Sequence, residues 1–300
     1  MQNAAFYILT SLIWGSTWLV ITFQLGVVAP EASIVYRFSL AALMLMVYVL
    51  ARRLPMRFTG WQHAFIALQG TFLFSLNYIL VYLAEQNLTS GLVAIVFSML
   101  ILSNVVLGAL FLRNPIRPRV VLGGVIGVVG LALVFRPELS GFVQGGGWRF
   151  GLVLSLAAVL SASIGNILSA RNQRAGLPVV QTNAFGMAYG AAVTLVIAVV
   201  RGVSFTFEPT ASYVLSLLYL AAFGSVIAFG TYLTLIGRMG VDRAAYIGVI
   251  FPLVAILLSI LFEGLGLGGL GLVGVALVAA GNVLVLNRRR ADPAPNPAGD

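Results

Sequence analysis

Long apolar segments alternate with short clusters of charge along this chain, and the pattern predicts helices that cross a membrane. About 20 apolar residues in a helix span the roughly 30 Å of a bilayer core. The segments are continuous rather than alternating apolar with polar positions, which favours helices over the strands of a β-barrel. We therefore expect an all-α integral membrane protein with ten transmembrane helices, at residues 3–23, 32–51, 64–84, 86–112, 120–135, 150–170, 175–200, 209–237, 244–262 and 264–287.

Composition supports the same class. Hydrophobic residues make up 60% of the chain and charged residues 8%, whereas a soluble domain carries roughly 25% charged residues. This balance excludes a disordered chain and a secreted disulfide scaffold, and the net charge of +9 does not indicate a nucleic-acid partner. The chain has no cysteine and one histidine, His63, so we expect no metal site and no cofactor.

The basic residues predict the orientation of the chain. All 17 are arginines, and thirteen of them lie in the even-numbered connections or the C-terminal tail, against three in the odd-numbered connections. The positive-inside rule therefore places both termini in the cytoplasm. The first segment lacks a basic start, so we interpret it as a retained span rather than a signal peptide. Residues 291–300 predict a disordered cytoplasmic tail.

The chain also resembles itself at an offset near 150 residues. Gly124 falls on Gly274, Leu83 on Leu233, and Pro30 matches Pro178. Each half would hold five helices, and because five is odd, the second half would enter the membrane from the opposite side. Inverted repeats with substrate between them are typical of secondary transporters. We predict a first repeat at residues 1–140 and a second, inverted repeat at 148–290.

Four short motifs resemble the drug/metabolite transporter superfamily of the EamA type: Leu12-Ile13-Trp14-Gly15-Ser16, Pro30 followed by Arg37-Phe38, Phe251-Pro252, and Phe262-Glu263. The aromatic-rich first and third segments look like the YddG group of aromatic amino-acid exporters. The resemblance implies export of aromatic and other neutral amino acids across a bacterial inner membrane. The halves differ at two positions, where Arg113 and Leu102 correspond to Glu263 and Pro252.

Aromatic and amide side chains at mid-span are the candidate substrate ligands. Trp14 and Trp18 are four residues apart and share a helix face, as do Tyr78 and Tyr82. Packing between helices and interhelical hydrogen bonding are the alternative roles, especially for serine. The full set of candidates is Trp14, Trp18, Asn77, Tyr78, Tyr82, Ser98, Ser163, Asn166, Tyr232 and Tyr246.

Two positions are candidate hinges and two are candidate charged groups. Gly15 softens the first helix, and Pro252 removes a backbone donor from the ninth. Arg37 is the only charge within a span, and either it snorkels outward toward Glu31 or Glu85, or it attracts a carboxylate. Glu85 lies at an outer helix end.

We expect a transporter that moves amino acids by alternating access through a central uncharged cavity. No Asp, Glu, Lys or His lies at mid-depth, which favours a facilitator, and no Walker loop is present. The alternative is a multidrug or lipophilic-cation effluxer that uses Trp14 and Trp18 as an aromatic cage. A membrane enzyme would need a catalytic cluster, which His63 alone does not provide. The lipid bilayer and a small molecule are the expected partners, and a monomer is compatible with the sequence.

Overall fold

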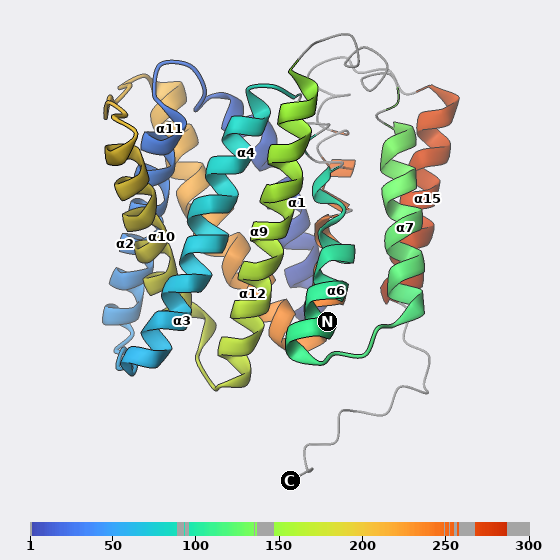
Figure 1. Ribbon diagram of the computed structural model, residues 1–300, viewed down its shortest axis with the longest axis horizontal. Helices are drawn as coiled ribbons and strands as arrows, with labels where there is room; N and C mark the ends of the chain where they lie inside the picture. The colour runs from blue at the N-terminus through green and yellow to red at the C-terminus, as the bar shows by residue number, and fades with distance from the viewer. Residues whose placement is uncertain are drawn as a thin grey trace.

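A computed structural model shows only helices in the part of the chain that it describes (Figure 1). The described residues are 2–88, 93, 96–134, 136, 147–248, 250–251, 253–254, 257 and 268–286, without the side chains of Trp18, Asn282 and Leu286. The predicted hinge Pro252 and the predicted tail 291–300 lie outside this part.

Six helical runs are long and apolar enough to cross a membrane: α1 (Gln2–Thr22), α2 (Pro30–Ala51), the run of α3 (Gly60–Gly70), η1 (Thr71–Leu76) and α4 (Asn77–Glu85), α9 (Trp148–Arg174), α10 (Val179–Val200), and the run of α11 (Ala211–Tyr219), η2 (Leu220–Ile227) and α12 (Ala228–Met239). Shorter helices are α6 (Leu100–Leu112), α7 (Pro118–Val134), α13 (Val241–Ala244) and α15 (Gly269–Leu286). The predicted segments 86–112 and 244–262 lie partly among residues that the structure does not describe, so the count of ten helices stays a prediction.

The helices stand side by side and turn back at the two ends of the bundle (Figure 1). α10 packs along α2, and α15 packs along α7. Large apolar side chains point outward, among them Phe111 at 70% and Val200 at 82% exposure. An apolar outer surface of this kind is stable in lipid, because hydrocarbon removes the cost of exposing it to water. The fold is therefore that of a multi-pass membrane protein.

Helix ends follow local sequence signals. The hydroxyl of Thr59 accepts a hydrogen bond from the Gln62 amide, while the Gln62 side chain accepts one from the Thr59 amide, so α3 begins with a capping box. Pro30 occupies the first turn of α2, where a missing N–H costs nothing. Gly240 ends α12 with a φ of +94°, a conformation that disfavours a side chain.

Two long runs contain a π-helical segment near the middle. η1 begins at Thr71 and η2 at Leu220, 149 positions later, close to the repeat offset of the sequence. In η2 the hydroxyl of Ser225 donates to the carbonyl of Leu220, five residues earlier, at 3.0 Å. The apolar windows predicted continuous helices and did not indicate these segments, which are often found at functional sites.

Candidate functional site

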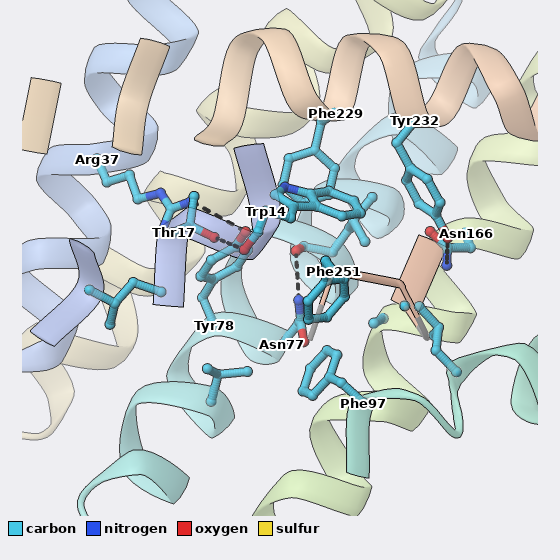
Figure 2. Close-up of a pocket in the computed structure, with 16 residues that line it drawn as sticks. Trp14, Thr17, Arg37, Asn77, Tyr78, Phe97, Asn166, Phe229, Tyr232 and Phe251 are labelled. Carbon is cyan, nitrogen blue, oxygen red and sulfur yellow. Dashed lines mark hydrogen bonds between the residues drawn. The ribbon is translucent and has the colours of Figure 1, made fainter. Parts of the chain in front are cut away.

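A cavity of about 80 Å³ lies inside the bundle, large enough for several water molecules (Figure 2). Its wall combines side chains from both halves of the chain, including residues just before and at the start of α6 and residues that follow α13. The lining residues are Trp14, Thr17, Ile21, Arg37, Leu73, Asn77, Tyr78, Val81, Phe97, Leu100, Ala162, Asn166, Phe229, Tyr232, Gly248 and Phe251.

Trp14 is the centre of the aromatic part of this wall. Its ring lies 5.0 Å from that of Phe229, 4.9 Å from Tyr232 and 6.4 Å from Phe251, centroid to centroid. These tilted and edge-on contacts are the arrangements that aromatic rings prefer. The indole N–H donates to the carbonyl of Gly224 in η2 at 3.2 Å, which fixes the orientation of the ring. The wall is thus a continuous aromatic surface, held by a π-helical carbonyl.

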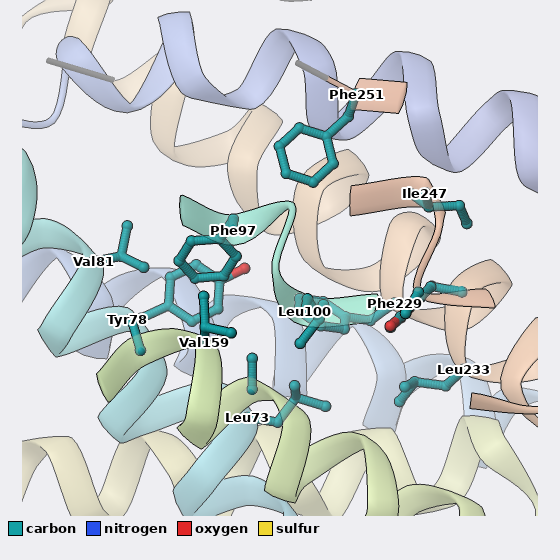
Figure 3. Packing of buried hydrophobic residues seen from close by; sticks show 14 of the residues in the cluster. Leu73, Tyr78, Val81, Phe97, Leu100, Val159, Phe229, Leu233, Ile247 and Phe251 are labelled. Carbon is teal, nitrogen blue, oxygen red and sulfur yellow. The ribbon is translucent and has the colours of Figure 1, made fainter. Parts of the chain in front are cut away.

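The aromatic wall belongs to the main hydrophobic core rather than standing apart from it. Figure 3 shows Phe97, Phe229 and Phe251 packed among aliphatic side chains such as Leu73 and Leu100. A planar or apolar substrate group would therefore meet a surface as rigid as the core itself.

Arg37 reaches the cavity from α2 and is only 1% exposed. Its Nε donates to the hydroxyl of Ser225 at 3.0 Å, and its Nη2 donates to the hydroxyl of Tyr78 at 3.4 Å. The guanidinium carbon lies 4.7 Å from the centre of the Tyr78 ring, within cation–π range. Nη1 is buried and finds no hydrogen-bond partner among the described residues.

Arg37 is therefore buried rather than exposed, and the choice between the two roles suggested by the sequence stays a prediction. Glu31, one of its two expected partners, pairs with Arg201 instead. Arg37 points inward because η2 offers it the Ser225 hydroxyl and α4 offers it the Tyr78 ring.

The expectation of an uncharged cavity is wrong, since a guanidinium forms part of its wall. No carboxylate of the described residues lies within ion-pair distance of Arg37; their ion pairs are Arg117 with Asp242 and Arg201 with Glu31. Glu85 does not line the cavity. Its Oε1 is enclosed and finds no hydrogen-bond partner in the described part of the chain, and the charge of Arg37 acts on it from a distance. The cavity therefore has a positive end.

Two asparagines add acceptors to the wall. Asn77 is 5% exposed and Asn166 1%. The amide nitrogen of Asn77 donates to the Leu73 carbonyl at 3.4 Å, and that of Asn166 donates to the Tyr232 hydroxyl at 3.0 Å. Both amide oxygens are buried without a partner among the described residues. In Figure 2, Arg37 and Asn166 lie at opposite sides of the cavity, and Asn77 lies between them.

Half of the substrate ligands predicted from the sequence line this cavity: Trp14, Asn77, Tyr78, Asn166 and Tyr232. Their role in binding stays a prediction. The side chain of Trp18 is not described. Gly15 packs closely, since a Cβ there would lie 2.7 Å from the Cγ1 of Val254, and its predicted hinge role also stays a prediction.

Four other candidates are buried but do not line the cavity: Tyr82, Ser98, Ser163 and Tyr246. Ser163 donates to the Asn104 side chain at 2.7 Å, and Tyr246 donates to the Val278 carbonyl of α15 at 3.0 Å. These two contacts join helices, which is the alternative role that the sequence left open. Tyr82 lies one turn farther along α4 than Tyr78; it does not line the cavity, but its hydroxyl lies beside the Arg37 guanidinium.

Sequence reasoning missed Thr17, Phe97 and Phe229 as wall residues. Without knowing where the neighbouring helices lie, one cannot tell from an apolar segment whether its phenylalanine faces the cavity or the lipid. The single histidine, His63, lies elsewhere, where its Nδ1 forms a hydrogen bond with the Tyr189 hydroxyl at 3.0 Å.

Ser225→Ala should lower the melting temperature in detergent, because the buried Nε of Arg37 would lose its acceptor, at a cost of about 1 kcal/mol. The matched control is Ser11→Ala, whose buried hydroxyl donates, among the described residues, only to the Tyr7 carbonyl of its own helix. Equal melting temperatures for the two variants would show that the Arg37 contact contributes nothing to stability.

Known proteins resemble this chain over most of its length. The model of the EamA-like transporter family matches residues 3–136 and 149–287. The "Uncharacterized inner membrane transporter YedA" of Escherichia coli (strain K12) is 30% identical over 279 residues, covering 91% of this chain and 85% of the relative. The "Probable amino-acid metabolite efflux pump" of Escherichia coli (strain K12) is 23% identical over 309 residues, covering 97% of each.

A solved crystal structure of a protein superimposes with a TM-score of 0.79 at 18% identity, covering 95% of this chain and 96% of the other. At that identity the similarity shows the fold alone. The two family matches together span most of the chain, which therefore belongs to the EamA-like transporter family and is a membrane transporter.

Proposed function

We propose that this protein is a secondary transporter that moves aromatic and other neutral amino acids across a bacterial inner membrane by alternating access. The observation that carries the proposal is the cavity between the two halves, with its aromatic wall around Trp14, its two amide oxygens and its buried guanidinium. Apolar lining with a few placed polar groups is typical of a small-molecule site. The relative named as an amino-acid metabolite efflux pump supports the same substrate class.

The proposed architecture is ten helices in two inverted five-helix repeats. Three observations support it: the two matched family segments, the corresponding positions of η1 and η2, and the pairing of α2 with α10 and of α7 with α15. Each of these pairs joins equivalent helices of the two halves. In this architecture the cavity would lie between the two repeats, as expected of a transporter that opens alternately to the two sides.

The proposed orientation places both termini in the cytoplasm. α1 begins and α15 ends at the same end of the bundle (Figure 1). α2, α6, α9 and α12 also end there, next to the arginine clusters 52–57, 113–119 and 171–174. The lipid bilayer and a free amino acid are the proposed partners, with no nucleic acid and no cofactor, and the protein acts as a monomer.

A lipophilic-cation effluxer is the alternative, and the aromatic wall around Trp14 is the observation that favours it. Arg37 argues against it. Two like charges 4 Å apart repel by about 4 kcal/mol at the effective dielectric constant of a protein site. A cation in this cavity would meet that repulsion with no described carboxylate in contact to offset it.

Proteoliposomes containing the purified protein should take up labelled phenylalanine and leucine, and uptake should not require a proton gradient. The panel should include tetraphenylphosphonium as the lipophilic cation. Uptake of neither amino acid would refute the proposal, and uptake of tetraphenylphosphonium alone would establish the alternative. Uptake that depends on the proton gradient would keep the substrate class but replace the facilitator with a coupled transporter.

A further inference from the structure

We propose that the cavity recognises both charged groups of a free α-amino acid, with Arg37 binding the carboxylate and the Asn77 amide oxygen accepting from the ammonium group. This inference rests on the proposed function and assigns roles within the same cavity. It starts from three buried polar atoms that have no partner among the described residues and that all belong to wall residues: Arg37 Nη1, Asn77 Oδ1 and Asn166 Oδ1.

Buried polar groups without partners are rare, because each one costs free energy, and a charged one costs most. Other buried atoms here also lack a partner, such as both amide atoms of Asn183 in α10, but that residue does not line the cavity. The three wall atoms share one cavity. A ligand with one acceptor group and one donor group could therefore bind the Arg37 donor with the first and an asparagine oxygen with the second.

Arg37 is suited to a carboxylate for three reasons. Its charge is buried, and no carboxylate of the described residues lies within ion-pair distance, so an anionic group in the cavity could pair with it directly. The guanidinium is held in place by Ser225 and Tyr78, so little side-chain freedom is lost on binding. The Tyr78 hydroxyl accepts from Nη2, which leaves its own proton free to donate to the same carboxylate.

Asn77 is suited to the ammonium group because its orientation is determined. Its amide nitrogen donates to the Leu73 carbonyl, which can only accept, so the oxygen is the atom left free. Asn77 is also the residue next to Tyr78 on the short helix α4, and the Tyr78 hydroxyl belongs to the proposed carboxylate site. Figure 2 shows it between Tyr78 and the rings of Phe97 and Phe251, against which an apolar substrate side chain would lie.

The recognised class is therefore a zwitterion with an apolar side chain. Amines, esters and amides of the same amino acid lack the carboxylate, and the corresponding carboxylic acids lack the ammonium group. The first group should lose the interaction with Arg37 and meet its charge instead. The second should keep that interaction and lose only a hydrogen bond to Asn77.

Binding to the wild-type protein tests this order without any substitution. Thermal stabilisation in detergent should be titrated with phenylalanine, phenylalanine methyl ester, phenethylamine and 3-phenylpropanoate, and with leucine and its matching derivatives. Phenylalanine should bind best, 3-phenylpropanoate next, and the ester and the amine at least about tenfold more weakly than phenylalanine. An ester or amine that binds as tightly as phenylalanine would overturn the inference, as would the absence of binding by every compound of both series.

Substitutions then assign the roles. Arg37→Gln should bring the ratio of phenylalanine to phenethylamine affinity close to one, and Arg37→Lys should retain part of the preference. Asn77→Leu should reduce the preference for phenylalanine over 3-phenylpropanoate. The matched controls are Arg52→Gln, at the exposed end of the same helix, and Asn183→Leu, both of which should keep the wild-type ratios. An unchanged ratio in Arg37→Gln overturns the assignment, and if that variant does not fold, the wild-type order decides.

Failure of this inference and failure of the proposed function are distinguishable. Binding in the expected order without flux of any amino acid would leave the site standing and remove the transport proposal. Amino-acid flux that phenethylamine inhibits as well as phenylalanine does would leave transport standing and remove the role of Arg37.

Discussion

Trp14→Ala is expected to reduce phenylalanine flux to less than about a tenth of the wild-type rate and to lower the melting temperature in detergent. The substitution removes ring contacts with Phe229, Tyr232 and Phe251, and it leaves the Gly224 carbonyl without its donor. Truncating a large aromatic side chain in a packed core costs about 3–5 kcal/mol. The enlarged cavity would also hold a substrate side chain less firmly. We therefore expect flux to fall even at temperatures at which the variant is still folded. Flux and melting temperature measured on one preparation check both effects.

The matched control is Trp61→Ala. Trp61 is 68% exposed, and the ring contact it makes among described residues is with Phe65, 5.0 Å away in the same helix. The Trp61→Ala substitution removes an indole of the same size from the surface of the bundle, so flux and melting temperature should stay near the wild-type values. Wild-type flux in Trp14→Ala, or an equal loss in both variants, would mean that the aromatic wall has no special part in transport.

The class of fold could be predicted from the sequence because a bilayer permits few backbone structures. Long uncharged segments bounded by arginine have few alternatives in lipid, where every backbone group must be bonded within a helix or a closed barrel. The predicted window 175–200 and the observed helix Val179–Val200 differ by four residues at the start, where Pro178 precedes the first turn. Charge and proline mark such ends directly.

The site could be predicted only in part. Spacing in a sequence shows which residues share a helix face, but not whether that face points to the cavity, to another helix or to lipid. The spacing of Trp14, Tyr78 and Asn166 indicated polar or aromatic stripes, and these stripes do meet in the cavity. A sequence does not show where each stripe ends, and Tyr246, a predicted ligand, donates to a carbonyl of α15. The depth of Arg37 is also not visible in the sequence: its position five residues from the end of the predicted segment suggests a route to water, whereas the side chain is buried.

The surroundings of Arg37 depend on η2. The apolar segment 209–237 predicts a continuous α-helix, whereas a π segment changes which side chains face inward. In the structure it presents the Gly224 carbonyl to Trp14 and the Ser225 hydroxyl to Arg37. A Cβ at Gly224 would lie 3.1 Å from Nη2 of Arg37, so a small residue is needed for this approach. Glycine followed by serine in an apolar segment is the signal that could have drawn attention to it.

Gly190→Ala is expected to lower the melting temperature by several degrees and to reduce flux, although Gly190 does not line the cavity. The added Cβ would lie 2.8 Å from the Cβ of Phe74 and 2.9 Å from the carbonyl oxygen of Gly70, both closer than real Cβ contacts. Neither atom is the free end of a flexible side chain, so α10 and η1 would have to separate. Overpacking of this kind costs about 1–3 kcal/mol.

The effect on flux follows from what η1 holds in place. Phe74 packs its ring 4.9 Å from that of Phe229, and Asn77 and Tyr78 follow directly after η1, so moving this segment shifts three wall residues together. The matched control is Gly230→Ala in α12, where an added Cβ meets no atom of the described residues within 4 Å and alanine favours the helix. It should keep wild-type flux and a melting temperature at or slightly above that of the wild type. If Gly190→Ala proved as stable as Gly230→Ala, the close packing of α10 against η1 would not be what positions Asn77 and Tyr78, and the cavity wall would have to be held by the contacts of α4 with α9 instead.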